Sequence, residues 1–179
     1  MAIRVGINGF GRIGRCIVRA IHERGERDLD VVAINDLTSA EALAHLLEFD
    51  SVHGRFSEHV RSEANTLRIG DKSISVSAER DPAALGWKKS GVDLVMECTG
   101  IFTKREKAAK HLDAGARSVL ISAPAADADL SVVYGVNHRQ IDAKKHRVIS
   151  NASCTTNCLA PMARVLLDQF GLTRGLVTT

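Results

Sequence analysis

Short apolar runs alternate along this chain with segments in which apolar residues recur at helical spacing. The first run, residues 2–7 (AIRVGI), is rich in β-branched residues and leads into glycines, which is typical of a buried strand. Residues 11–25 then follow a helical period and stop at a glycine. A second strand is predicted at residues 29–36, followed by a helix at 39–49 that Ser39 caps. This β–α–β–α alternation favours a parallel sheet.

The middle of the chain departs from that alternation. Residues 50–65 are polar and show no clear period, so we expect them to form a loop. Residues 66–77 alternate about Gly70-Asp71 as a hairpin does, and Pro82 stands where it can open a short helix.

The parallel pattern then resumes. Strands are predicted at residues 92–100, 118–124, 131–136, 147–152 and 175–179, and a helix at residues 103–115. The segment that begins at residue 153 is helical in pattern, so Pro161 must kink that helix or mark its true start.

Composition narrows the class of protein. Of 179 residues, 45% are hydrophobic and 25% charged, without a run of about 20 apolar residues that would span a membrane. The formal charge of +3 is scattered and aromatic residues are few, so nucleic acid is a poor candidate partner, although small anions fit. Neither Cys16 nor Cys98 has the neighbours of a metal site or a disulfide framework. We therefore expect a soluble cytoplasmic protein with reduced thiols, no metal and no membrane partner.

Residues 9–14 (GFGRIG) match the pattern G-x-G-x-x-G between a predicted strand and an amphipathic helix. In that context Gly9 allows the tight turn, Gly11 lets the backbone approach a diphosphate, and Gly14 lets helix and strand pack closely. The second strand ends at Asp36, about 20 residues on, where a carboxylate accepts hydrogen bonds from ribose hydroxyls and repels a 2′-phosphate. The pattern predicts a site for NAD rather than NADP. The alternative is a plain glycine turn with an incidental loop aspartate.

Arg12, Thr99 and Gly100 are further candidates for the same cleft. Arg12 follows the second glycine of the motif, where its charge could lie along a diphosphate; the alternative is a solvated arginine on the first helical turn. Thr99 and Gly100 end a predicted strand at the carboxyl edge of the sheet, where ligands bind in such folds. The alternative there is a plain strand-to-helix turn.

The stretch SNASCTTNC, residues 150–158, holds a candidate nucleophile. Ser153 is a good N-cap, which would place Cys154 at the first position of a helix, where the helix dipole favours a thiolate. Cys158 would lie one turn further along the same face, and two thiols alone are too few ligands for a metal. The alternative is that Cys154 is a small buried residue, but its polar neighbours are unlike a core segment.

A dinucleotide site combined with a nucleophilic thiol points to aldehyde oxidation. Alcohol dehydrogenation needs no nucleophile, whereas a thiolate that adds to an aldehyde gives a thiohemiacetal, which loses a hydride to nicotinamide and becomes a thioester. Water or another acceptor must then resolve that thioester. The hydroxyls of Ser153 and Thr155, beside the thiol, could hold an anion such as phosphate.

Several segments from the start to the end of the chain carry a family resemblance: INGFGRIGR, AIND, DSVHGRF, ECTGIF, ISAPA, VYGVN and SNASCTTNCLAP. Together they resemble the phosphorylating glyceraldehyde-3-phosphate dehydrogenases of glycolysis. The resemblance implies cofactor contacts by Arg12 and Ile13 with the NAD phosphates, by Asp36 with the adenosine ribose, and by Thr99, Gly100 and Ser122 in the cofactor cleft.

The same resemblance implies the roles of the thiol segment. Cys154 would be the acylated nucleophile. The substrate would be glyceraldehyde 3-phosphate, and Ser153 and Thr155 would contact the inorganic phosphate that attacks the thioester and releases 1,3-bisphosphoglycerate from Cys154. The family pairs this cysteine with a histidine on the strand that residues 175–179 begin, and none of the seven histidines of this chain matches that position.

The resemblance also implies a division of the chain. Residues 1–152 would form an α/β domain of the Rossmann type, with a doubly wound, mainly parallel sheet, and residues 153–179 the truncated start of an α+β catalytic domain. We expect this chain by itself to bind NAD weakly and not to turn over. The family is typically a cytoplasmic homotetramer.

Two alternative functions would require residues other than those of a phosphorylating dehydrogenase, or fewer of them. Erythrose-4-phosphate dehydrogenase is a relative that resolves its thioester with water, and it tends to carry Glu where this chain has Asp36 and another residue in place of Phe102. A non-catalytic NAD-binding regulatory protein would keep the fold, but binding alone does not require Cys154.

Overall fold

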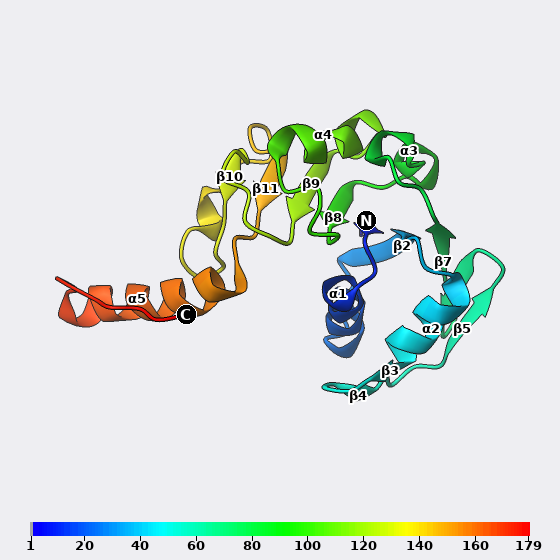
Figure 1. Ribbon diagram of the computed structural model, residues 1–179, viewed down its shortest axis with the longest axis horizontal. Coiled ribbons are helices and arrows are strands. Elements are labelled where there is room, and N and C mark those ends of the chain that lie inside the picture. Colours follow the sequence, from blue (N-terminus) through cyan, green and yellow to red (C-terminus); the bar gives the residue numbers. More distant parts are fainter. Residues whose placement is uncertain (1) are drawn as a thin grey trace.

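The computed structural model describes residues 2–179, and these contain a nine-stranded sheet with helices on both faces (Figure 1). The order across the sheet is β10-β11-β9-β8-β1-β2-β7-β6-β5. The strands are β1 (Ile3–Asn8), β2 (Leu29–Asn35), β5 (Val60–Glu63), β6 (Thr66–Ile69), β7 (Lys72–Ser77), β8 (Leu94–Glu97), β9 (Ser118–Ile121), β10 (Leu130–Ser131) and β11 (Val148–Ser150).

The sheet is parallel from β10 to β7, and only β6 and β5 run against their neighbours. From β1 the chain proceeds outward to β2 and the strands beyond it, and it later returns to place β8 on the other side of β1. The change of direction beside β1 is the topological switch point at which ligands bind in open α/β sheets. The predicted doubly wound, mainly parallel fold is therefore confirmed.

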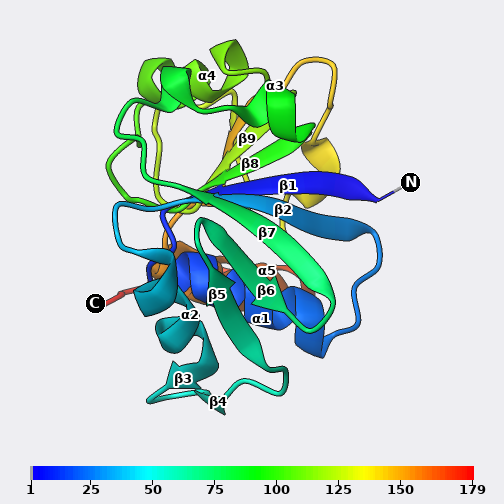
Figure 2. The ribbon, with the colours of Figure 1, turned by 90° about the vertical axis from the view of Figure 1, so that its right-hand side faces the viewer.

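The helices cover the two faces of the sheet in pairs (Figure 2). α1 (Arg12–Glu23) and α2 (Ala40–Glu48) lie over one face, and α3 (Trp87–Ser90) and α4 (Arg105–Asp113) over the other. Two 3₁₀ turns, η1 (Pro82–Ala84) and η2 (His138–Gln140), lie in the connections. Because both faces are covered, the central strands read as apolar runs rather than as alternating patterns.

Each face has its own hydrophobic core. Under α1 and α2 the buried side chains include Ile7, Leu47 and Leu67. Under α3 and α4 the core is built around Trp87, which is 2% exposed, and Val95. Burying side chains of this size stabilises the fold by about 1.5–3 kcal/mol each.

Local sequence signals account for the element ends. The Ser39 hydroxyl accepts a hydrogen bond from the backbone N–H of Ala42, so it caps α2 as predicted. Asp81 caps η1 in the same way, with Pro82 at its first position. β6 and β7 pair as the predicted antiparallel hairpin.

Three expectations were wrong. Residues 50–65 are not a plain loop, because β3 (Phe49–Asp50) pairs with β4 (Gly54–Arg55), and β5 extends the sheet through its hairpin with β6. Residues 131–136 are not a strand beyond Ser131, because the Asn137 side chain accepts the backbone N–H of Val133 and closes a turn there. Residues 175–179 form no strand, since no neighbouring strand is placed to pair with them in residues 2–179.

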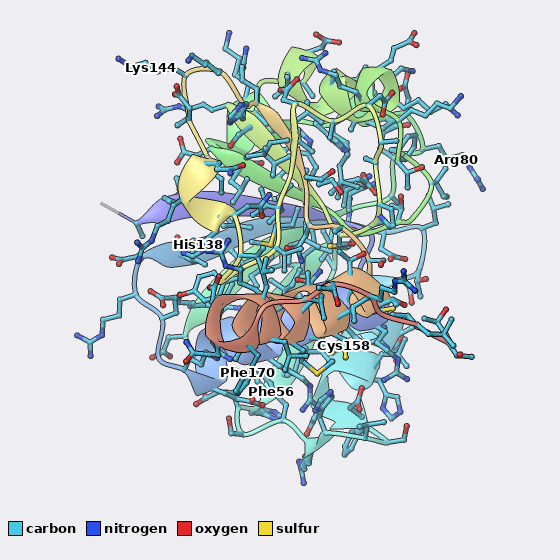
Figure 3. The ribbon with its side chains drawn as sticks, turned by 90° about the vertical axis from the view of Figure 1, so that its left-hand side faces the viewer. Phe56, Arg80, His138, Lys144, Cys158 and Phe170 are labelled. Atoms are coloured by element: carbon cyan, nitrogen blue, oxygen red, sulfur yellow. The ribbon has the colours of Figure 1, made fainter. Side chains whose placement is uncertain are left out.

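The last helix, α5 (Cys154–Phe170), projects from the end of the sheet (Figure 1). It starts where Ser153 was predicted to cap it and continues through Pro161. Figure 3 looks onto this helix, with Cys158 near its first turns and Phe170 at its far end. None of its described residues is buried, and its apolar side chains Leu166, Leu167 and Phe170 are exposed.

Asp129 joins three segments of the sheet's outer part. One carboxylate oxygen accepts Arg105 Nε at 2.6 Å, and the other accepts the backbone N–H groups of Arg147 at 2.8 Å and Val148 at 2.9 Å. Burial raises the pKa of Asp129, but the bonds from Arg105, Val148 and Arg147 outweigh it, so the net pKa is lowered. A carboxyl with a lowered folded pKa stabilises the fold above its unfolded pKa near 3.9.

Asp129→Asn should therefore lower the free energy of unfolding at neutral pH by about 1–3 kcal/mol, because the new amide NH₂ faces N–H donors. The difference from the wild type should shrink as the pH falls below about 4 and through the lowered pKa of Asp129, because the wild-type carboxyl then takes up a proton and loses its charge. Urea denaturation across this pH range measures both effects. Asp113→Asn, at an exposed position at the end of α4, is the control. An equal loss in both variants, or a loss independent of pH, would contradict the role given to Asp129.

Candidate cofactor cleft and thiol site

A cleft of about 450 Å³ lies at the carboxyl ends of β1, β2, β7 and β8. This volume is within the range of small-molecule sites. Its wall comes from the four segments that follow those strands, and the residues are Asn8, Gly9, Gly11, Asn35, Asp36, Leu37, Glu79, Arg80, Cys98, Thr99, Ile101 and Phe102. The cleft therefore unites four of the predicted cofactor residues: Gly9, Gly11, Asp36 and Thr99.

Each glycine of the G-x-G-x-x-G segment occupies its position for a different physical reason. Gly9 has φ +89°, and a Cβ there would lie 2.7 Å from the backbone nitrogen of Thr99. A Cβ on Gly14 would overlap the carbonyl oxygen of Gly9, so helix α1 can approach the turn only without a side chain. Gly11 faces open space. Two of the three glycines are thus required by packing, and the third leaves room beside the backbone.

Asp36, directly after β2, holds the glycine turn in place through a hydrogen bond to its carboxylate. Its Oδ2 accepts the backbone N–H of Phe10 at 2.7 Å, and its Oδ1 accepts the N–H of Thr38 at 2.9 Å. A carboxylate has about four lone-pair sites, so acceptor capacity remains on the cleft side. Asp36 can therefore hold the turn and accept hydroxyl donors at the same time.

The other predicted cofactor residues lie outside the cleft wall. Arg12 and Ile13 are exposed on the first turn of α1, and Arg12 Nη1 is 4.0 Å from Asp50 Oδ2. The N-cap of α1 is Gly11, which has no side chain to satisfy the first N–H groups of the helix. Such a helix start is a ready site for an anionic group. Gly100 has φ +72° and serves the turn after β8.

Ser122 stands at the end of β9, beside the thiol of Cys98. Burial raises the pKa of Cys98 to about 11, against a lowering by the hydrogen bond with Ser122 and a further rise from the charge of Glu97. Cys98 is a cleft residue that sequence reasoning did not select, but at neutral pH it remains a thiol and is a poor nucleophile.

Sequence reasoning also missed the buried polar residues Asn8 and Asn35 in the cleft wall and Glu97 behind it. Glu97 is 1% exposed, and Asn8 and Asn35 are buried beside it. Asn8 Nδ2 donates to Glu97 Oε2 at 2.6 Å, and Asn35 Nδ2 donates to Asn8 Oδ1 at 2.8 Å. Their only signal in the sequence is position, since each lies at the end of an apolar strand, where a side chain reaches the carboxyl edge of the sheet.

The thiol segment follows β11, at the same edge of the sheet, because β11 runs parallel to β9. Cys154 is the first residue of α5 and is exposed. The Ser153 hydroxyl accepts the backbone N–H of Thr156 at 3.0 Å, which confirms the predicted cap. Thr155 is exposed next to the thiol. Of the predicted site residues, Ser153, Cys154 and Thr155 thus form a second group, separate from the cleft wall.

The turn before Cys154 is held in an uncommon conformation. Ala152 has φ +56°, a region that residues with a Cβ seldom adopt. Its N–H donates to the Ser150 hydroxyl at 3.1 Å, and the Asn157 amide donates to the carbonyls of Asn151 and Ser153 at 2.7 and 2.9 Å. Strain fixed by surrounding bonds is frequent at functional turns.

The described residues offer neither a metal-binding cluster nor a membrane-spanning helix. Among residues 2–179, no group of three or more His, Cys, Asp and Glu side chains is placed to hold a metal ion. In the same residues no helix combines the length and apolar character needed to cross a membrane.

The fold and cleft define a dinucleotide-binding α/β domain followed by a helix that presents a cysteine at its start. Residues 3–105 match the family model described as glyceraldehyde 3-phosphate dehydrogenase, NAD binding domain, and residues 153–179 match the C-terminal domain of the same family. The first match covers more than half of the chain. The chain therefore belongs to the glyceraldehyde-3-phosphate dehydrogenase family, and NAD is the cofactor of the domain that it contains.

Individual relatives agree with the family match. Glyceraldehyde-3-phosphate dehydrogenase 1 of Bacillus subtilis is 59% identical over 179 residues, which is 100% of this chain and 53% of that protein. The glyceraldehyde-3-phosphate dehydrogenases of Geobacillus stearothermophilus and Xanthobacter flavus are 59% and 58% identical over the same shares. The chain thus spans about half the length of the curated relatives that it matches.

The cysteines should differ in reactivity because they differ in burial. At neutral pH iodoacetamide should modify the exposed Cys154 readily, and Cys98 at least about 100-fold more slowly than a free cysteine with pKa near 8.5. The rate at Cys98 should rise only as the pH approaches its own pKa of about 11. Peptide mapping by mass spectrometry measures each site, with the urea-unfolded chain as the control. Equal labelling of Cys98 and Cys154 in the folded chain would contradict this assignment.

Proposed function

We propose that this chain forms the cofactor half of an enzyme that oxidises glyceraldehyde 3-phosphate with NAD and phosphate to 1,3-bisphosphoglycerate. The observation that carries the proposal is the joint placement of two features at one edge of the sheet. One is the cleft with its open glycine turn and Asp36, and the other is the exposed Cys154 at a helix start. A binding protein would need only the first.

The residues of the cleft fit NAD. Gly11 leaves space beside the uncapped start of α1, which suits a diphosphate, with Arg12 and Ile13 on the same turn. Asp36 has acceptor capacity for the hydroxyls of the adenosine ribose, and its charge disfavours a 2′-phosphate. Thr99 lies on the opposite wall, with Gly100 and Ser122 in the adjoining turns. When bound, NAD⁺ supplies a hydride acceptor.

The thiol segment supports the covalent part of the reaction. The Cys154 thiolate adds to the aldehyde carbon, which gives a thiohemiacetal; loss of a hydride and a proton then gives a thioester on the sulfur. Inorganic phosphate attacks the thioester carbon, the C–S bond breaks, and the thiolate is regenerated with release of the acyl phosphate. Ser153 and Thr155 flank the sulfur and would hold the attacking phosphate through their hydroxyls.

The division of the chain belongs to the same proposal. Residues 1–152 are assigned to the NAD-binding domain and residues 153–179 to the start of the catalytic domain, and this boundary is supported by the lack of buried residues in α5. The chain alone is then expected to bind NAD without turnover. For the whole enzyme we propose a cytoplasmic homotetramer, on the basis of the family membership.

The decisive assay is NADH formation from glyceraldehyde 3-phosphate and NAD⁺ by the chain extended to the length of its relatives, with and without inorganic phosphate. Turnover that requires phosphate is the expected result, and Cys154→Ser should abolish it. Turnover indifferent to phosphate, or seen only with erythrose 4-phosphate, would assign the protein to the hydrolysing relative. NAD binding without turnover of either aldehyde would favour a regulatory NAD-binding protein.

Asp36 gives a test on the 179-residue chain itself. Asp36→Asn removes the charge and turns an amide NH₂ toward the N–H of Phe10 or Thr38, so both the ribose contact and the turn are weakened. We expect the Kd for NAD⁺ to rise about tenfold or more, and the preference for NAD⁺ over NADP⁺ to fall. Titration calorimetry measures both, with Asp71→Asn in the exposed β6–β7 turn as the control. An unchanged preference would argue against Asp36 as the ribose ligand.

A further inference from the structure

Glu97 is a buried acidic residue for which the proposed reaction has no role. It is 1% exposed, and the ion pairs formed within residues 2–179 give it no lysine or arginine partner. Neutral donors satisfy it instead: Asn8 Nδ2 at 2.6 Å and His111 Nε2 at 2.9 Å reach Oε2, while the N–H of Thr99 at 2.8 Å and the Thr99 hydroxyl reach Oε1. A carboxylate held in this way needs every one of these donors, because its own burial is costly.

The histidine of this group has only one tautomer open to it. Trp87 Nε1, which can only donate, lies 3.0 Å from His111 Nδ1, so that nitrogen must accept. The proton of a neutral His111 is then on Nε2, which donates to Glu97. Both His111 and Trp87 are buried, at 0% and 2% exposure. The order of donation thus runs from Trp87 through His111 to Glu97.

On its other side Glu97 reaches the wall of the cofactor cleft. Thr99 donates its backbone N–H and its hydroxyl to Glu97, and the same hydroxyl oxygen accepts the N–H of Ile101 at 3.0 Å. The glycine turn lies close against this segment, since a Cβ on Gly9 would be only 2.7 Å from the backbone nitrogen of Thr99. Asn8 connects Glu97 to Asn35 on the neighbouring strand.

We propose that Glu97, held by the Trp87–His111 pair, is a positioning residue that fixes Thr99 and Asn8 on the wall of the cofactor cleft. This proposal rests on the proposed NAD site. In it Glu97 maintains the shape of that site and does not contact the reacting atoms. It also makes Trp87, the one tryptophan of the chain, a reporter of the cleft.

Glutamine at position 97 is the sharpest perturbation because it keeps the shape of the side chain and changes only its hydrogen bonding. If its NH₂ takes the place of Oε2, it faces Asn8 Nδ2 and the Nε2 proton of His111. Asn8 cannot turn its amide oxygen toward the glutamine without losing the bond from Asn35. His111 cannot move its proton to Nδ1 without losing the bond from Trp87. If the NH₂ takes the place of Oε1, it faces the backbone N–H of Thr99. Every orientation opposes a donor to a donor.

Glu97→Gln in the 179-residue chain should therefore raise the Kd for NAD⁺ at least tenfold, measured by titration calorimetry. The control is Leu67→Ala, a fully buried core position on β6 outside the cleft wall, which should lower the thermal midpoint but leave Kd within about twofold. Equal Kd values for wild type and Glu97→Gln would overturn the proposal. An equal rise in the Kd for NAD⁺ in Leu67→Ala would overturn the proposal as well, since general destabilisation of the fold would then explain the effect.

A second measurement needs no cofactor and spares Glu97 itself. The nitrogen–proton NMR spectrum of the chain has a single indole N–H signal, that of Trp87. Thr99→Val removes one donor from Glu97, and the changed bond from His111 to Glu97 should move this signal by more than its line width. Ile101→Val alters the cleft wall without removing a hydrogen bond and should leave the signal in place.

The two measurements separate the two claims. If the wild-type chain binds no NAD⁺, the proposed cofactor site fails, but the indole signal still decides whether Trp87 and Thr99 are connected through Glu97. If the wild type binds NAD⁺ and Thr99→Val leaves the indole signal unmoved, the cofactor site stands and the positioning role of Glu97 is refuted.

Discussion

The structure around the cleft depends on one constraint: a carboxylate buried at the end of β8 must be satisfied by neutral hydrogen-bond donors. Glu97 receives these donors from β1, from the turn after β8 and from α4. Because an unpaired buried charge is costly, the ends of these segments are held in one arrangement. Under the proposed positioning role of Glu97, these bonds hold the cleft in the shape that binds the cofactor, which would lower the ordering cost of binding.

The second constraint is the parallel topology of the sheet, which places the carboxyl ends of the parallel strands on one side. All the parallel strands end at one edge, so the segments after β1, β2, β7, β8 and β11 lie along that edge although they are far apart in the sequence. The cleft uses the first four of these segments, and the thiol segment follows β11. A fold that has one ligand-bearing edge can thus place a dinucleotide and a nucleophile together, which is the combination that aldehyde oxidation requires.

The sequence predicted features that arise from local chemistry. The apolar runs of β1, β2, β8 and β9, the caps at Ser39 and Ser153 and the glycine turn all follow from neighbouring residues. Prediction failed where partners are distant: β5 is a strand because β6 lies beside it, and residues 175–179 have no such neighbour. Glu97 escaped notice for the same reason, since Asn8 and His111 lie 89 and 14 residues away in the sequence.

The most direct test is a crystal structure of the chain with NAD⁺. The cofactor is predicted to lie in the cleft, with the ribose hydroxyls on the Asp36 carboxylate, the diphosphate at the start of α1, and the hydrogen bonds that Thr99 and Asn8 donate to Glu97 intact. A cofactor bound elsewhere, or bound in the cleft only after those Glu97 bonds have broken, would contradict the view that a preformed, Glu97-centred sheet edge makes the site.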